Sequence, residues 1–275
     1  MSPIIVGSEV EGEIIIKDVM TSEVLFYDEE FEEDCKKYCK ERDITYLPSV
    51  NDPNNIVYTL VNDEFEKQTL KESQKIFPEI EIFDKGLLEK FEGHPVLFVY
   101  QKNKRIGVTH FSDYNRNPVF IYLYLLLLDF EKKLRELLTL HGLTNDDMIE
   151  FFKEHLANKV YAKRYEEFNN DEKRKEMSEL EPFQMFYLKE LIGLASSKGI
   201  IKLPDLINDN IRNLIMHIQN PIQHDNYEES ELIYDLESFK KFFSDVTTFR
   251  TENRKLKNKL LLMTLKCQTS SSHSS

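Results

Sequence analysis

The sequence predicts a multidomain α+β protein, with a small mixed unit at residues 1–116 and an all-α unit at residues 117–265. Up to residue 116, short β-branched and aromatic runs alternate with short amphipathic segments. From residue 117 onward, apolar residues recur at helical spacing over long stretches. The last residues, 266–275, are small and polar, and we predict a disordered tail there.

Composition places the chain among globular proteins. Its 275 residues are 41% apolar and 31% charged, enough for two domains that each bury a core. The net charge of −13 argues against a surface built for bulk nucleic-acid binding, but it leaves a local basic cleft open. The three cysteines, Cys35, Cys39 and Cys267, are an odd and sparse set, and we expect a cytoplasmic protein in which Cys35 and Cys39 are reduced thiols.

Membrane association is not expected. The N-terminus lacks a basic region followed by an apolar core and a cleavage site. The most apolar run, at residues 119–128, is about half as long as a bilayer crossing requires. We therefore interpret this run as a helix buried in a core or at a subunit interface.

The N-terminal elements are expected in two rounds, each with a helix followed by a hairpin. The first round has extended segments or strands at 13–19, 23–28, 44–50 and 55–61 and a helix at 29–42. The second has helices at 64–76 and 85–93 and extended segments or strands at 80–84, 95–100 and 105–110. One repeat after about 60 to 70 residues suggests a pseudo-symmetric pair.

Long helices are expected in the second half of the chain. Their predicted spans are 118–141, 145–168, 171–197, 205–219 and 231–262. Thr144 is a suitable N-cap, and Gly142 and Gly199 stand where helices should stop. Pro204 suits the start of a helix, and Pro221 ends one.

Three segments of the first half resemble a pair of CBS repeats. They are "KDVMT" at 17–21, "YLPSV" at 46–50 and "RIGVTHFSD" at 105–113, and the resemblance covers residues from about 10 to 115. In that family each repeat is a small β-α-β-β-α unit, and two repeats pack into a module that often binds adenosine-type nucleotides. The resemblance implies a CBS-pair-like regulatory domain at 1–116, with an adenine nucleotide as its effector.

The family's pattern G-h-h-T-x-x-D, where h is apolar, falls on residues 107–113. His110 occupies the family's Thr position, and Thr109 stands one place earlier. The resemblance implies that Thr109, His110 and Asp113 hold the ribose hydroxyls. Because His110 departs from the pattern, a ligand-free CBS pair with a structural or dimerising role is the alternative.

The hexapeptide "RNLIMH" at 212–217 lies near the end of the fourth predicted helix. Its R-x4-H spacing and the preceding long helices resemble a HEPN domain, and a helix directly after a CBS-like segment resembles a recurring fusion of the two families. A spacing of five turns the side chains apart by about 140° on one helix. The resemblance implies that two copies of the motif face each other in a homodimer.

The activity implied is metal-independent RNA cleavage that leaves a 2′,3′-cyclic phosphate and a 5′-hydroxyl. By resemblance, Arg212 would clamp the scissile phosphate, His217 would act as general base or acid, and Asn213 would orient either group. No metal or other cofactor is required for this chemistry. The alternative is a non-catalytic scaffold with a degenerate HEPN domain that senses nucleotides or binds a protein, in which Arg212 pairs with Asp205 or Asp209.

Other sequence features give weaker signals. No glycine pattern that cradles phosphates is present. His217, His224 and Asp225 are poor candidate metal ligands, because Pro221 separates the first from the others. The run at 250–259 is either a basic rim for RNA or a solvated helix face. Glu131 and Arg135 are spaced for an ion pair on one helix.

Overall fold

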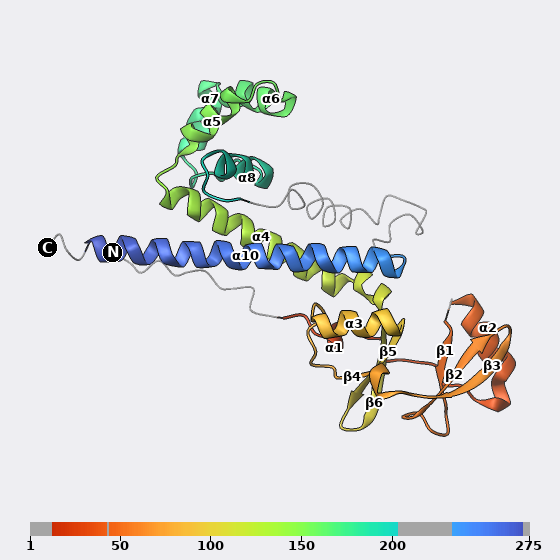
Figure 1. The fold of residues 1–275 in the computed structure, drawn as a ribbon. Coiled ribbons are helices and arrows are strands. Elements are labelled where there is room, and N and C mark those ends of the chain that lie inside the picture. The colour runs from red at the N-terminus through yellow and green to blue at the C-terminus, as the bar shows by residue number, and fades with distance from the viewer. Residues whose placement is uncertain (1–12, 43, 203–232, 272–275) are drawn as a thin grey trace. The chain divides into compact units, whose positions relative to one another are not determined.

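A computed structural model describes residues 13–42, 44–202 and 233–271 (Figure 1). This part of the chain is a mixed α+β protein with two three-stranded sheets, followed by helices. It forms two compact units. The first combines the described residues up to Tyr122 with residues 233–244, and the second combines residues 123–202 with residues 245–271.

The first sheet is antiparallel and has the order β1-β2-β3. Its strands are β1 (Tyr46–Pro48), β2 (Ile56–Val61) and β3 (Glu64–Thr69). A 3-10 turn (Glu29–Phe31) and α2 (Glu32–Glu41) precede β1, and Tyr27 pairs in parallel with Ser49 through a single bridge. Both described cysteines, Cys35 and Cys39, are free thiols buried in the core beneath α2.

The second sheet has the order β4-β5-β6, with β4 parallel to β5 and β5 antiparallel to β6. Its strands are β4 (Lys75–Ile76), β5 (Val96–Gln101) and β6 (Lys104–His110), and α3 (Lys85–Gly93) connects β4 to β5. The two sheets therefore share one order of elements. In each, an extended segment is followed by a helix, by a strand that pairs in parallel with that segment, and by an antiparallel strand. The interval is shorter than predicted, because α2 begins at Glu32 and α3 at Lys85.

Two N-terminal predictions were wrong. Residues 13–19 were expected as a strand or extended segment, but α1 (Ile16–Val19) is a short helix whose Asp18 carboxylate accepts from the Ile15 amide at 3.0 Å. Residues 64–76 were expected as a helix, but they form β3, a 3-10 turn (Glu72–Gln74) and β4. Asn62 and Asp63 both have positive φ, as a tight hairpin turn requires, so pairing with β2 overrides the helical spacing.

Two long predicted helices are each divided in the structure. The helix α4 (Asn117–Leu140) agrees with the predicted span 118–141. The predicted helix 145–168 is instead α5 (Asn145–Glu154) and α6 (Lys159–Phe168), and the Asn158 side chain caps the second of these. The predicted helix 171–197 is α7 (Asp171–Ser178) and α8 (Leu188–Ser197), separated by a turn in which Phe183 has φ 65.

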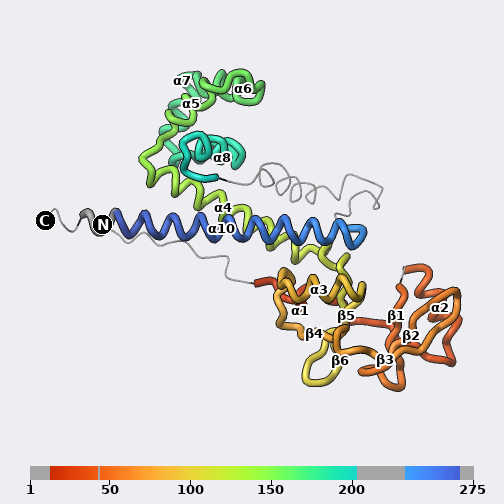
Figure 2. Tube along the Cα trace, viewed as in Figure 1, coloured from red at the N-terminus to blue at the C-terminus, as the bar shows by residue number. Residues whose placement is uncertain are grey.

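The last described helix is α10 (Leu236–Ser271), which is continuous in the trace (Figure 2). It extends beyond the predicted end at 262 and into the segment that we predicted as a disordered tail. The predicted helix 205–219 lies outside the described residues.

An aromatic core in the first unit includes the start of α10. Phe239 packs against Phe91 and Tyr114, with ring centroids 5.4 Å and 4.8 Å apart. Asn115 holds Ile233 through two hydrogen bonds, one donated by the Asn115 amide group at 2.7 Å and one accepted from the Ile233 amide at 3.1 Å. Residues 233–244 therefore complete the core of the first unit.

The second unit is helical. In it, α4 and α10 pack through Phe130 and Phe249, whose ring centroids are 5.1 Å apart. The Asn253 amide donates to Asp129 at 2.9 Å. A separate aromatic cluster joins α5, α6 and the segment before α8 through Phe152, Phe168 and Phe186.

Candidate functional site

The predicted catalytic residues Arg212, Asn213 and His217 lie outside the described residues, as do His224 and Asp225. The described part of the chain offers two regions that bear on function. One is the turn at residues 110–116, which carries the predicted nucleotide-binding residues. The other is a lysine-lined pocket in the helical unit.

The turn begins where β6 ends at His110 and continues as a 3-10 turn (Phe111–Asn115). The His110 amide donates to the Asp113 carboxylate at 2.8 Å, and the Ser112 amide donates to His110 Nδ1 at 3.2 Å. The Ser112 hydroxyl also lies 2.7 Å from His110 Nδ1, so this ring nitrogen is engaged by its own turn. The backbone thus brings His110 and Asp113 together.

Asp113 is also paired with Arg116, whose Nη2 lies 2.7 Å from the second carboxylate oxygen. Arg116 donates in addition to the Val19 carbonyl at 2.7 Å and to Thr21 Oγ1 at 2.5 Å. Burial raises the pKa of Asp113 above its ordinary value, although Arg116 and the His110 amide oppose the shift. Both carboxylate oxygens are therefore engaged by the chain itself.

Thr109 is fully buried in β6, opposite Leu97. Its hydroxyl does not reach the surface, so a bound ribose would require the strand to move. The Thr109 side chain nevertheless lies close enough to Asp113 to help lower the pKa of that carboxyl, so the structure groups all three predicted nucleotide-binding residues.

The structure explains why position 107, in the same motif, is a glycine. A Cβ atom there would lie 2.7 Å from the Thr21 carbonyl oxygen, which β6 approaches through the bridge between Thr21 and Val108. A glycine at this position allows the two segments to pair closely. The segments at 17–21 and 105–113, on which the CBS resemblance rests, are thus in direct contact.

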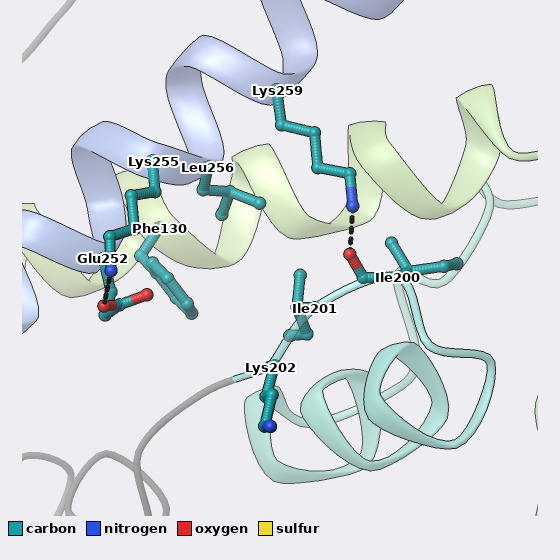
Figure 3. Close-up of a pocket in the computed structure, with 8 residues that line it drawn as sticks. All are labelled: Phe130, Ile200, Ile201, Lys202, Glu252, Lys255, Leu256 and Lys259. Atoms are coloured by element: carbon teal, nitrogen blue, oxygen red, sulfur yellow. Dashed lines mark hydrogen bonds and ion pairs between the residues drawn. The ribbon is translucent and has the colours of Figure 1, made fainter.

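A pocket of about 180 Å³ lies in the helical unit (Figure 3). It is lined by Phe130, Ile200, Ile201, Lys202, Glu252, Lys255, Leu256 and Lys259. Lys255 pairs with Glu252 at 2.7 Å, and Lys259 donates to the Ile200 carbonyl. Three lysines and one glutamate give the pocket a net positive lining in a chain of net charge −13.

This pocket fits an anion better than a reacting centre. Ammonium groups bind phosphate or carboxylate oxygens as point charges, and the apolar wall lowers the screening around them. None of the lining residues is a histidine, so the pocket holds no general base suited to neutral pH. Its lining therefore offers positive charge that could hold an anion, but no group suited to proton transfer.

Comparisons with known proteins identify no relative. No family model, no curated protein and no solved structure matches this chain. In the described ranges, no group of three or more His, Cys, Asp or Glu side chains is placed to hold a metal ion. None of the helices described is both long enough and apolar enough to cross a membrane.

Two weaker sequence signals are clarified by the structure. The predicted ion pair between Glu131 and Arg135 is confirmed, with 2.5 Å between the charged atoms. The basic run at 250–259 contributes Lys255 and Lys259 to the pocket, so it is more than a solvated helix face. Ile200 and Lys202, which complete the pocket, could not be assigned to it from sequence, because only the fold brings them beside α10.

Proposed function

We propose that the protein is a metal-independent endoribonuclease of the HEPN type, which acts as a homodimer and is regulated by a nucleotide bound to its N-terminal unit. The observation that carries this proposal is the R-x4-H hexapeptide at 212–217, between α8 and α10 of a helical region. The lysine-lined pocket supports it, because Lys202 directly precedes the segment 203–232 and a positive lining attracts RNA phosphates.

In this mechanism a base removes the proton from a ribose 2′-hydroxyl, and the 2′-oxygen attacks the adjacent phosphorus. The bond to the 5′-oxygen breaks, and an acid protonates that leaving oxygen, giving a 2′,3′-cyclic phosphate and a 5′-hydroxyl. His217 supplies one of the two proton transfers, since imidazole titrates near neutral pH. Arg212 stabilises the charge on the phosphorane oxygens, and Asn213 orients a partner.

Regulation would pass through the turn at residues 110–116. Asn115, at its end, holds Ile233, which directly follows the segment that carries the hexapeptide. Phe111 stacks on Phe239 of α10 with ring centroids 5.9 Å apart. A nucleotide that contacted His110 and Asp113 would act on the motif segment if it bound two arrangements of this turn with different affinity.

A non-catalytic scaffold is the second candidate, and one observation favours it. Asp113 and Arg116 are already occupied by contacts within the chain, as expected of a module whose role is structural. In that case the helical unit binds a protein partner rather than RNA.

The two candidates are separated by incubating the full-length protein with RNA in EDTA, with and without AMP or ATP. We expect cleavage, with His217→Ala and Arg212→Ala each reducing the rate by about 10²-fold or more. His141→Ala and Arg42→Ala are matched controls, since both side chains are exposed and lie outside the basic run at 250–259, and should cleave normally. Equal cleavage by all variants would assign the activity to another site or a contaminant, and no cleavage by an intact dimer would favour the scaffold.

A further inference from the structure

Arg105 on β6 is a half-buried cation without an acidic partner. Its guanidinium carbon lies 5.3 Å from the ring centroid of Phe26 and 6.0 Å from that of Phe98. Among the described residues, none forms an ion pair with Arg105, and its buried Nη1 has no hydrogen-bond partner. Burial lowers the pKa of Arg105 to about 10, still well above neutral pH.

The charge of Arg105, which no acidic group in the described part of the chain neutralises, produces a positive potential at surfaces that the side chain does not touch. Proteins generally pair a buried charge, because water no longer solvates it. The rings of Phe26 and Phe98 stabilise the cation through their faces but do not cancel its charge. In weakly screening surroundings, the positive potential of Arg105 therefore reaches neighbouring surfaces.

A polar cleft of about 410 Å³ lies beside the β5–β6 hairpin that carries Arg105, although Arg105 itself does not line it. It is lined by Asn54, Asn55, Glu72, Lys75, Ile76, Phe77, Tyr100 and Asn103. Tyr100 lies opposite Arg105 in the β5–β6 hairpin. The Asn54 side-chain oxygen accepts from the Arg105 backbone amide at 2.9 Å, and the Asn54 carbonyl oxygen accepts from the Tyr100 hydroxyl. These bonds connect the wall of the cleft to the backbone of Arg105.

The cleft contains a cation of its own. Lys75 Nζ lies 5.2 Å from the centroid of the Tyr100 ring and 2.7 Å from Glu72, whose side chain is 87% exposed. The Lys75 side chain is 22% exposed, and because Glu72 is solvated the pair contributes little stability, so an anion in the cleft can compete with Glu72 for Lys75. Asn54 and Asn103 add amide groups, and the exposed Phe77 ring adds an apolar surface at the rim.

We propose that this cleft binds a small ligand bearing an oxyanion, held directly by Lys75 and stabilised by the charge of Arg105 behind Tyr100 and Asn54. The volume falls within the range of about 300–1,000 Å³ that is usual for small-molecule sites, which points to a metabolite rather than a macromolecule. Phosphate and carboxylate groups share the chemistry that Lys75 recognises. The site goes beyond the proposed function, because it uses none of Thr109, His110 and Asp113 and needs no RNA cleavage.

Binding is tested on the full-length protein by thermal unfolding and titration calorimetry with inorganic phosphate, AMP and citrate. Sodium chloride at matched ionic strength separates specific binding from screening. We expect a saturable rise in Tm with at least one of the three anions. A response to AMP beyond that to phosphate identifies a nucleotide, whereas a response to citrate alone identifies a carboxylate.

Three variants locate the site. Lys75→Met and Arg105→Met should weaken the affinity about tenfold or more, since each removes a cation that favours the anion. Lys104→Met, an exposed neighbour on the same strand, has the same change in net charge and should bind as the wild type does. Equal weakening by Lys104→Met, or no saturable rise in Tm with any of the anions, would overturn the proposal.

A readout without ligand distinguishes a binding role of Arg105 from a packing role. Arg105→Met should unfold at the same Tm as the wild type or at a higher one, because it removes an uncompensated buried charge. A large fall in Tm would instead make Arg105 a packing residue and contradict its assignment here. His217→Ala should retain full anion binding, so failure of the ribonuclease proposal leaves this test intact.

Discussion

Asp113 lies between two donors, the His110 amide at 2.8 Å and the Arg116 guanidinium at 2.7 Å, and it is largely buried. Burial dominates these contacts and raises its pKa above the ordinary value of 3.8. The folded protein therefore binds a proton at Asp113 more readily than the unfolded chain does. It follows that this residue makes the free energy of unfolding fall as the pH rises from about 4 through the raised pKa.

Asp113→Asn removes this titration while keeping an oxygen that can accept from the His110 amide. We expect the wild type to lose stability relative to Asp113→Asn as the pH rises through this window, as measured by urea unfolding between about pH 3.5 and 7. Arg116→Met should enlarge the loss and extend it to higher pH, because Arg116 opposes the rise in the pKa of Asp113. If the wild type instead gained stability over the variant with rising pH, Arg116 would dominate over burial.

Arg105 shows which residue properties the sequence could not reveal. Its place in a strand was predicted correctly, since β6 spans Lys104–His110. Its lack of an acidic partner depends on Phe26 and Phe98, which come from separate segments and meet only in the folded chain. The "RNLIMH" hexapeptide, by contrast, could be found from sequence because all of its residues are local.

At the scale of elements, α6 and the start of α8 are joined by a buried ion pair. Arg164 Nε and Nη2 donate to the Glu190 carboxylate at 2.7 Å and 3.1 Å. The guanidinium also lies over the rings of Phe168 at 4.5 Å and Tyr187 at 4.8 Å. Both charged groups are buried, and Arg164 Nη1 also pairs with the Glu167 carboxylate at 2.8 Å, so Glu190 depends on Arg164 while Arg164 has two carboxylate partners.

Glu190→Gln should destabilise the helical unit by about 1–3 kcal/mol, because it removes the more buried of the two carboxylates that compensate the Arg164 charge. Chemical unfolding followed by circular dichroism measures this change. The double variant Arg164→Met/Glu190→Leu should recover much of the loss, since neither charge remains. Glu176→Gln, which breaks the exposed pair with Lys173, is the control and should have no measurable effect. Equal effects of Glu190→Gln and Glu176→Gln would contradict the argument.

Sequence spacing predicted elements well where local signals dominate. The helices α3 and α4 and the hairpin of β5 and β6 agree with expectation within a residue or so. The prediction failed for residues 64–76, because β3 is mostly exposed and its strand conformation depends on pairing with β2. The division of residues 145–168 was also missed, although Asn158 is a recognisable N-cap.

At the scale of the whole molecule, α10 contributes to two cores. Residues up to Ser244 belong with the first unit, and those from Asp245 onward belong with the second. The contact between Asn115 and Ile233 joins residues 118 positions apart. No local pattern encodes such a return of the chain, and for this reason residues 233–244 were assigned by sequence to the helical domain alone.

The assignment of the two parts of α10 to different cores can be tested by the same substitution at two phenylalanines. Phe239 is fully buried among Phe91 and Tyr114 of the first unit, and Phe249 is buried against Phe130 of the second. Truncation of a buried phenylalanine to alanine costs about 3–5 kcal/mol, and the loss falls on the core that the ring fills. The two variants should therefore weaken different parts of one protein.

Amide hydrogen exchange followed by mass spectrometry reads out each core separately. Phe239→Ala should accelerate exchange in α3 and β5, with little change in residues 123–140 of α4. Phe249→Ala should show the reverse, with faster exchange in residues 123–140 and near-normal exchange in β5. If both variants accelerated exchange throughout the chain, the two units would unfold as one cooperative body, and α10 would transmit strain between the cores rather than serve each of them independently.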